Sequence, residues 1–299
     1  MQRLISPRQG LTLAALGLLA ACADQSTSPM NDAAPTSGTG RVTAGVPLGQ
    51  FWQQGQSPAV ATPFARAAAL LTYHNGPVIK ASKTQAIFWG PQWSNGSFPA
   101  DVIPGLDQLY SGWGGSRYNG LNTEYGDATS KITSASTYLG HVFDGTAAPT
   151  GALSTTQAVA EGCKISGNNP DPNALYIIYT PTFPSNVGYC AWHSWGNCSN
   201  DAPIQVAYEP NPAGVAGCDP TDTWTTHSQM LASLANTSSH ELAETETDPR
   251  GTGWYDRQGN ENADKCAWQF SASVTLANGS IWKIQKNWSN ASRGCLQGS

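Results

Sequence analysis

The segment His240-Glu241-Leu242-Ala243-Glu244 contains residues whose types and spacing suit metal chemistry. On a helix, residues four apart lie on one face, so His240 and Glu244 can reach one point in space. An imidazole nitrogen and a carboxylate oxygen are both zinc ligands, and the adjacent Glu241 can take a proton from metal-bound water. This pattern is the H-E-x-x-H arrangement of metallohydrolases with its second histidine replaced by glutamate.

A third ligand has to come from outside this helix. Glu261 and Asp264 are the nearest acidic candidates downstream. The 21 residues from His240 to Glu261, together with the pair Asn260-Glu261, resemble the gluzincin metallopeptidases, in which a downstream Asn-Glu supplies the third ligand. We therefore expect either Glu261 or Asp264 to be the third ligand. As a non-ligand, Asp264 would accept a hydrogen bond from the imidazole of His240.

The choice of ion follows from the ligand types. Calcium is a rival to zinc because it prefers hard carboxylate oxygens. Four acids in this region could supply them: Glu244, Asp248, Glu261 and Asp264. His240 favours zinc, since calcium rarely accepts a nitrogen ligand.

Acidic residues are concentrated around the same segment. Seven of the 20 lie between positions 240 and 264, namely Glu241, Glu244, Glu246, Asp248, Asp256, Glu261 and Asp264. Only Arg250 and Arg257 oppose them there. Closely packed like charges repel, so these side chains either face water or surround a cation. The alternative to a metal site is thus an ordinary solvated helix face.

The elements that must position these residues can be read from periodicity. Apolar and small residues at helical spacing predict a long helix over Thr225–Asp248, which Pro249 should end. Other expected elements are a helix over Pro99–Trp113, strands over Gln85–Trp89, Ala174–Tyr179 and Ile204–Tyr208, and a hairpin of Ser271–Leu276 with Ser280–Gln285 around Asn278-Gly279. The predicted fold class is mixed α/β (α+β) and zincin-like: a sheet with a long metal-site helix and disulfide-tied loops.

The N-terminus resembles the leader of a bacterial lipoprotein. Arg3 and Arg8 precede a short apolar run, Leu11–Ala21, which suits a signal peptide and is too short to span a membrane. The run ends in small residues before Cys22, which is the expected lipidation site. Residues 1–21 are therefore predicted to be a signal peptide, residues 22–63 a flexible tether rich in small and polar residues, and residues 64–299 a single domain.

The remaining cysteines fit an oxidising compartment. They number six, an even count that favours three disulfides: Cys163, Cys190, Cys198, Cys218, Cys266 and Cys295. The expected pairs are Cys190–Cys198, across a short loop, and Cys266–Cys295, between the last strands, which leaves Cys163–Cys218 by elimination. A cysteine zinc site is not favoured, because the chain has no C-x-x-C pair.

Composition excludes some classes of function. Only 12% of the 299 residues are charged and the formal net charge is −5, with no basic stretch, which argues against nucleic-acid binding. The 31 glycines and 20 prolines make a helical bundle improbable. Contact with a membrane is expected only through the lipid anchor at Cys22.

Several motifs together resemble the phosphate-induced protein 1 family, also called Exordium, of secreted plant and bacterial proteins. The matching segments are Leu71–Val78, His240–Glu244, Gly253–Asp256 and Glu261–Cys266, and they span nearly the whole domain. The resemblance implies an extracytoplasmic location and, in plants, a link to cell expansion, but no settled biochemical activity. The chain departs from the plant pattern at Thr245–Thr247, where a more apolar stretch is usual.

Two other histidines are expected to have structural roles. His74, beside Asn75-Gly76, is interpreted as a turn residue. His193 lies between Trp192 and Trp195, and such tryptophans usually pack over a disulfide, although an aromatic loop can also line a substrate cleft.

Two functions of different class remain open. The first is a secreted or surface-tethered zinc-dependent hydrolase, peptidase-like, that acts on an extracellular peptide or cell-wall substrate with Glu241 as general base. The second is a non-catalytic extracellular or cell-wall factor with a structural metal. Glu241 separates the two, because a structural site does not need a free carboxylate beside the ion.

Overall fold

The computed structural model describes residues 41–56, 69–96, 98 and 100–298. The predicted signal peptide, the lipidation site Cys22 and much of the predicted tether lie outside these residues. None of the helices in the described ranges is both long and apolar enough to cross a membrane.

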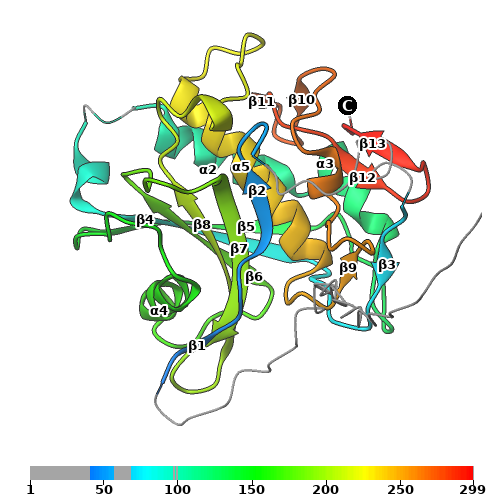
Figure 1. Cartoon of the computed structure of the whole chain (residues 1–299), viewed down its shortest axis with the longest axis horizontal. Helices are drawn as coiled ribbons and strands as arrows, with labels where there is room; N and C mark the ends of the chain where they lie inside the picture. Colours follow the sequence, from blue (N-terminus) through cyan, green and yellow to red (C-terminus); the bar gives the residue numbers. More distant parts are fainter. Residues whose placement is uncertain (1–40, 57–68, 97, 99, 299) are drawn as a thin grey trace, which may run out of the picture. The chain divides into compact units, whose positions relative to one another are not determined.

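A mixed sheet forms the centre of the described domain, in the strand order β1-β7-β8-β6-β4-β5, with β2 also paired to β7 (Figure 1). Its strands are β1 Thr43–Ala44, β2 Leu48–Trp52, β4 Ser82–Trp89, β5 Ser136–Asp144, β6 Ala174–Thr180, β7 Tyr189–Asn197 and β8 Pro203–Pro210. The strands β5, β4, β6 and β8 are parallel neighbours, whereas β7 runs antiparallel to β8.

Helices cover both faces of this sheet, and strand β6 contributes to both layers. Leu175 and Ile177 belong to a core with α2 (Val102–Trp113) and α5 (Gln229–Thr247). Tyr176 and Ile178 alternate with them and belong to a second core with α4 (Thr155–Ile165). Figure 1 shows α4 on the opposite side of the sheet from α2 and α5. A strand buried on both faces explains the nearly continuous apolar sequence of this segment.

Helix α5 has clear chemical boundaries. The Ser228 side chain accepts a hydrogen bond from the backbone N–H of Leu231 and caps its start. The helix ends at Thr247, two residues before Pro249, in agreement with the predicted stop. Every residue of α5 after Gln229 is buried, including its acidic ones. A wholly buried helix with so many polar groups requires a partner for each of them.

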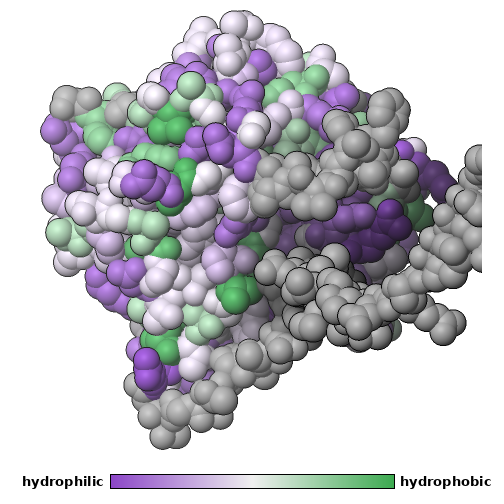
Figure 2. All heavy atoms as spheres, in the orientation of Figure 1, coloured by the Kyte–Doolittle hydropathy of each residue, from purple (hydrophilic) through white to green (hydrophobic). Residues whose placement is uncertain are grey.

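Smaller elements, placed before, between and after the strands of the sheet, complete the described fold. They are α3 Arg117–Gly120, the 3₁₀ turns η1 Pro91–Ser94, η2 Leu121–Glu124, η3 Ala216–Cys218 and η4 Asp264–Cys266, and the strand pairs β3 Thr72–Tyr73 with β9 Trp254–Tyr255, β10 Val274–Thr275 with β11 Ile281–Trp282, and β12 Asn287–Ser289 with β13 Gly294–Leu296. The pair β10–β11 is the predicted hairpin. On the face in Figure 2, apolar residues lie singly or in small groups among hydrophilic ones, as is usual for a soluble surface.

The prediction that residues 22–63 form a flexible tether is wrong for residues 41–56. This stretch contributes β1 and β2, which pair antiparallel with β7, and the Phe51 side chain is fully buried. The composition of this segment did not indicate strands, because its stability comes from main-chain pairing with a sheet edge and from few large side chains.

Two of the three predicted disulfide pairs are also wrong. The structure pairs Cys163 with Cys198 and Cys190 with Cys218, and it confirms Cys266–Cys295. Cys190 lies near the start of β7 and Cys198 directly follows its end. An extended strand separates such residues by about 26 Å, far beyond the reach of one disulfide. Three disulfides are typical of an extracellular or otherwise oxidising location.

Candidate functional site

The predicted motif lies in the second half of α5, where the helix packs on the sheet. His240, Glu241 and Glu244 are all fully buried. The Nε2 atom of His240 lies 3.1 Å from Oε1 of Glu244, as expected for residues four apart on one helix face.

Asp264, at the start of η4, approaches the same helix face. Its Oδ1 lies 3.6 Å from Nε2 of His240. Its backbone N–H donates a hydrogen bond to Oε1 of Glu244 at 2.8 Å, and its Oδ2 accepts one from the backbone N–H of Glu261 at 3.3 Å. His240, Glu244 and Asp264 thus present ligand atoms within 4.8 Å of one another.

A second group of ligand type shares Glu244. His193, on β7, places Nε2 3.4 Å from Oε1 of Glu261 and 3.8 Å from Oε2 of Glu244. The interpretation of His193 as a packing residue in a loop is therefore corrected: it is a strand residue whose ring faces α5. Glu261, one of the two predicted third ligands, approaches His193, whereas Asp264 approaches His240.

Burial controls the protonation of this cluster. It raises the pKa values of Glu241, Glu244 and Glu261 well above their usual range, and the neighbouring carboxylates of the cluster contribute further. Burial also lowers the pKa of His193 to about 3 and that of His240 to about 4. At neutral pH both imidazoles are uncharged, and the clustered carboxyls lack a compensating cation among the ion pairs of the described residues.

Several polar atoms of the cluster form no hydrogen bond within the part of the chain that the structure describes. They are both ring nitrogens of His193, Nε2 of His240, both carboxyl oxygens of Glu241, Oε2 of Glu244 and Oε2 of Glu261. Buried polar atoms without partners are rare in folded proteins and carry a free-energy cost of about 1–3 kcal/mol each. The cluster therefore gathers ligand-type atoms that other groups of the described residues do not satisfy.

Gln285 determines the proton position on His240. Its Oε1 accepts the backbone N–H of Trp268 at 3.3 Å, and its Nε2 donates to the carbonyl of Ala263 at 2.8 Å. The same Nε2 lies 3.1 Å from Nδ1 of His240, which therefore acts as the acceptor. In the neutral ring the proton is then on Nε2, facing Glu244.

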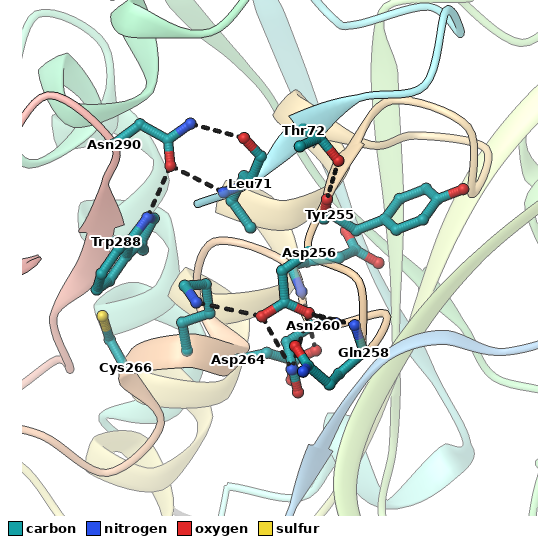
Figure 3. A network of polar contacts seen from close by, with 12 residues as sticks. Leu71, Thr72, Tyr255, Asp256, Gln258, Asn260, Asp264, Cys266, Trp288 and Asn290 are labelled. Atoms are coloured by element: carbon teal, nitrogen blue, oxygen red, sulfur yellow. Dashed lines mark hydrogen bonds and ion pairs between the residues drawn. The ribbon is translucent and has the colours of Figure 1, made fainter. Parts of the chain in front are cut away.

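The loop that carries Glu261 and Asp264 is anchored by a polar network (Figure 3). Lys265 and Asp256 form a buried ion pair at 3.2 Å. The Lys265 ammonium also lies 4.3 Å from the ring centroid of Trp288. Oδ1 of Asp256 accepts the backbone N–H groups of Gln258 and Asn260 and so closes the turn before the two acids. The disulfide to Cys295 then fixes Cys266, the last residue of η4.

His74 lies apart from this cluster, as predicted. It is followed by Asn75 at a φ of 70°, the left-handed conformation of a turn residue. Its ring stacks on Tyr255 at 3.6 Å, and its Nε2 lies 3.2 Å from the Tyr255 carbonyl oxygen.

Comparisons with protein-family models, with curated proteins and with solved structures find no match for this chain. The resemblance to the phosphate-induced protein 1 family and the zincin-like part of the predicted fold stay predictions. The fold is mixed α/β, with a central sheet and helices on both of its faces.

Proposed function

We propose that this protein is an extracytoplasmic metal-dependent hydrolase, peptidase-like, whose site binds one divalent ion, zinc by preference. The observation that carries the proposal is the convergence of His193, Glu244 and Glu261, from three distant segments, with unpartnered polar atoms turned toward one another. Three protein ligands are the usual number at catalytic zinc, and here they would be one imidazole and two carboxylates.

The distances between these atoms fit one small ion. Two ligands at zinc distances in a tetrahedral arrangement lie about 3.4 Å apart. The Nε2 atom of His193 lies 3.4 Å from Glu261 and 3.8 Å from Glu244. A divalent ion would also stabilise the ionised form of the buried carboxyls, and the low pKa of His193 keeps its ring neutral for ligation.

The predicted ligand His240 belongs to a second possible group with Glu244 and Asp264. We favour His193, because Gln285 places the His240 proton on the nitrogen that faces Glu244. In this tautomer the Nε2–H group of His240 lies 3.1 Å from Oε1 of Glu244, where it is placed to orient that carboxyl and is not itself a ligand. Orientation of a ligand by a hydrogen-bond donor is common around metal sites.

Glu241 is the proposed general base, since its buried carboxyl lies among the acids of the site and forms no hydrogen bond in the described residues. A bound zinc ion would lower the pKa of a water ligand and polarise a substrate carbonyl. Burial and the neighbouring Glu244 raise the pKa of Glu241, which makes its carboxylate a stronger base than an ordinary glutamate.

Metal analysis of the purified protein, together with hydrolysis of a peptide library, tests this proposal. We expect His193→Ala to lose the metal and Glu241→Gln to keep it but lose at least a hundredfold in activity. The control His141→Ala changes an exposed histidine and should keep both metal and activity. Wild-type protein that takes up neither zinc nor calcium would exclude the metal site.

A second function is favoured by the burial of the site. Structural metal sites are closed, and here His193, Glu244 and Glu241 have no exposed surface. The second candidate is therefore a non-catalytic cell-envelope factor of the Exordium type with a structural zinc or calcium ion. In that case Glu241→Gln and wild type would bind metal equally, and neither would hydrolyse any peptide.

We also propose that the protein is exported and lipid-anchored at Cys22. The three disulfides support an oxidising location, and the leader sequence resembles a lipoprotein signal. Labelling with a radioactive fatty acid tests the anchor: Cys22→Ala should lose the label and leave the membrane fraction.

A further inference from the structure

Strand β2 crosses the candidate site along the edge of β7 that faces away from β8. It pairs antiparallel with β7, with Leu48 opposite His193, Phe51 opposite Ala191 and Trp52 opposite Tyr189. The register is interrupted between Leu48 and Phe51, where Gly49 and Gln50 bulge out of the regular pairing. The bulge lies beside the site residue His193.

Gly49 is the point of closest approach. A Cβ atom on this residue would lie 1.9 Å from Oε2 of Glu244 and 2.6 Å from Nε2 of His193. Its φ of +43° is also in the left-handed region that favours glycine. The backbone of β2 therefore lies directly over the proposed ligand atoms, and any side chain at this position would collide with them.

Two residues further on, a side chain of β2 fills an aromatic slot. The Phe51 ring stacks between the rings of His240, at 4.3 Å, and Trp268, at 4.5 Å. It has no exposed surface. The indole N–H of Trp268 also donates to the carbonyl of Trp52 at 2.9 Å, so the slot holds both the ring and the backbone of β2.

The segment after β2 is held through its main chain as well. The backbone N–H of Gln53 donates to the carbonyl of Gly188 at 2.8 Å, and that of Gln54 donates to Gly217 at 2.9 Å. Main-chain pairing with a sheet edge, plus a pocket for one side chain, is the way in which domains bind extended peptides by strand addition.

We propose that the β7 edge and the slot between His240 and Trp268 are a binding site for an extended peptide with a Gly-x-aromatic sequence. Strand β2 is the occupant that the chain itself supplies, and it covers the metal site until it is displaced. The inference deepens the proposed hydrolase function and rests on it for one point: a peptide that replaces β2 would be the substrate, with its glycine over His193 and Glu244.

The test uses the full chain and a fluorescent peptide with the sequence of residues 46–54, Val-Pro-Leu-Gly-Gln-Phe-Trp-Gln-Gln. In wild type, the tethered β2 competes at a high effective concentration, so micromolar peptide should not bind. Phe51→Ala empties the slot and should bind the peptide at least tenfold more tightly in an anisotropy titration. Gly49→Ala places a side chain against Glu244 and His193, so it should displace β2 and also bind the peptide more tightly. It replaces Phe51→Ala as the test variant if that protein does not fold.

Matched controls define the slot. Phe143→Ala removes a half-exposed phenylalanine of β5 and should bind no better than wild type. The double variant Phe51→Ala/Trp268→Ala should lose the gain, as should a peptide in which alanine replaces phenylalanine. Folded Phe51→Ala and Gly49→Ala variants that both fail to bind the peptide would overturn the inference.

Titrations with zinc and with EDTA separate this inference from the proposed hydrolase. If the variants bind the peptide both with zinc and with EDTA but do not cleave it when zinc is present, the docking site is supported and catalysis is contradicted. Cleavage of other peptides by variants that do not bind this one supports catalysis and contradicts the docking site.

Discussion

Glu246 and Glu244 lie two residues apart on α5, and both side chains are fully buried, but their surroundings differ. Oε1 of Glu246 accepts hydrogen bonds from Ser82 at 2.7 Å and from the indole of Trp113 at 2.9 Å, and its Oε2 accepts one from Asn122 at 2.6 Å. Oε2 of Glu244 forms no hydrogen bond within the described residues, and its neighbours are other acids and imidazoles.

The two acids point to nearly opposite sides of the helix, because two residues turn it by about 200°. The Glu246 side is complete: donors on β4, α2 and η2 are joined through one carboxyl. On the other side, Oε1 of Glu244 accepts the backbone N–H of Asp264, and Oε2 forms no hydrogen bond within the described residues. Both acids are buried, and they differ in how many of their carboxyl oxygens accept a hydrogen bond in the described residues.

The largest expected effect on the free energy of unfolding is at Glu246, whose carboxyl accepts three hydrogen bonds. Glu246→Ala leaves three donors without an acceptor and opens a cavity, so the free energy of unfolding should fall by about 4–6 kcal/mol. Urea denaturation measures it. Glu246→Gln keeps the volume and should lose clearly less. If the alanine variant lost under about 1 kcal/mol, the contrast between the two sides would not hold.

Glu209, on β8, is intermediate, since one oxygen accepts from Thr237 and the other forms no hydrogen bond among the described residues. Burial raises its pKa from 4.5 to about 8. A raised folded-state pKa gives stability that is complete below pH 4.5 and is lost as the pH rises through about 8.

At 1.36 kcal/mol for each pKa unit, this loss amounts to about 4–5 kcal/mol. The difference in unfolding free energy between wild type and Glu209→Gln, measured from pH 5 to pH 8.5, should show it. A difference independent of pH would mean that Glu209 titrates normally.

In the cluster around Glu244, an added divalent ion should bind the carboxyl oxygens that accept no hydrogen bond in the described residues. Zinc at a thousand times its dissociation constant should raise the free energy of unfolding by about 4 kcal/mol, and EDTA should reverse the gain. Calorimetry with and without zinc measures the change. The gain should vanish in His193→Ala and persist in His141→Ala; an equal gain in both variants would place the ion elsewhere.

The smallest stability effect is expected at Glu241. Its carboxyl is crowded by other acids and forms no side-chain hydrogen bond in the described residues, and glutamine keeps an oxygen that can face the backbone of Phe51. The free energy of unfolding should change by less than about 1 kcal/mol, against several for Glu246→Ala. A loss as large as that of Glu246→Ala would assign Glu241 a structural role.

Local sequence was sufficient to predict part of the fold and part of the candidate site. The predicted helix over residues 225–248 is α5, Gln229–Thr247, because apolar spacing, a serine cap and a following proline act within the segment itself. The approach of His240 to Glu244 follows from helix geometry alone. The apolar run Ala174–Tyr179 likewise predicted a strand, which is β6 in the structure.

Other parts depend on contacts that no local pattern encodes. His193 reaches Glu244 only because β7 is placed between β2 and β8, and β7 itself was interpreted as a loop. The strands before residue 64 were missed since their polar and small residues are typical of linkers. The disulfides of Cys163 and Cys190 depend on sheet order, which sequence spacing does not reveal.

The position of β1 and β2 also affects the solubility of the protein. Together they pair with both ends of β7, from Tyr189 to Asn197, and so cover a row of backbone groups at the rim of the sheet. An uncovered rim of this kind recruits strands from other molecules. Proteolytic removal of β1 and β2 would therefore create self-associating protein, and light scattering would detect it before turbidity appears.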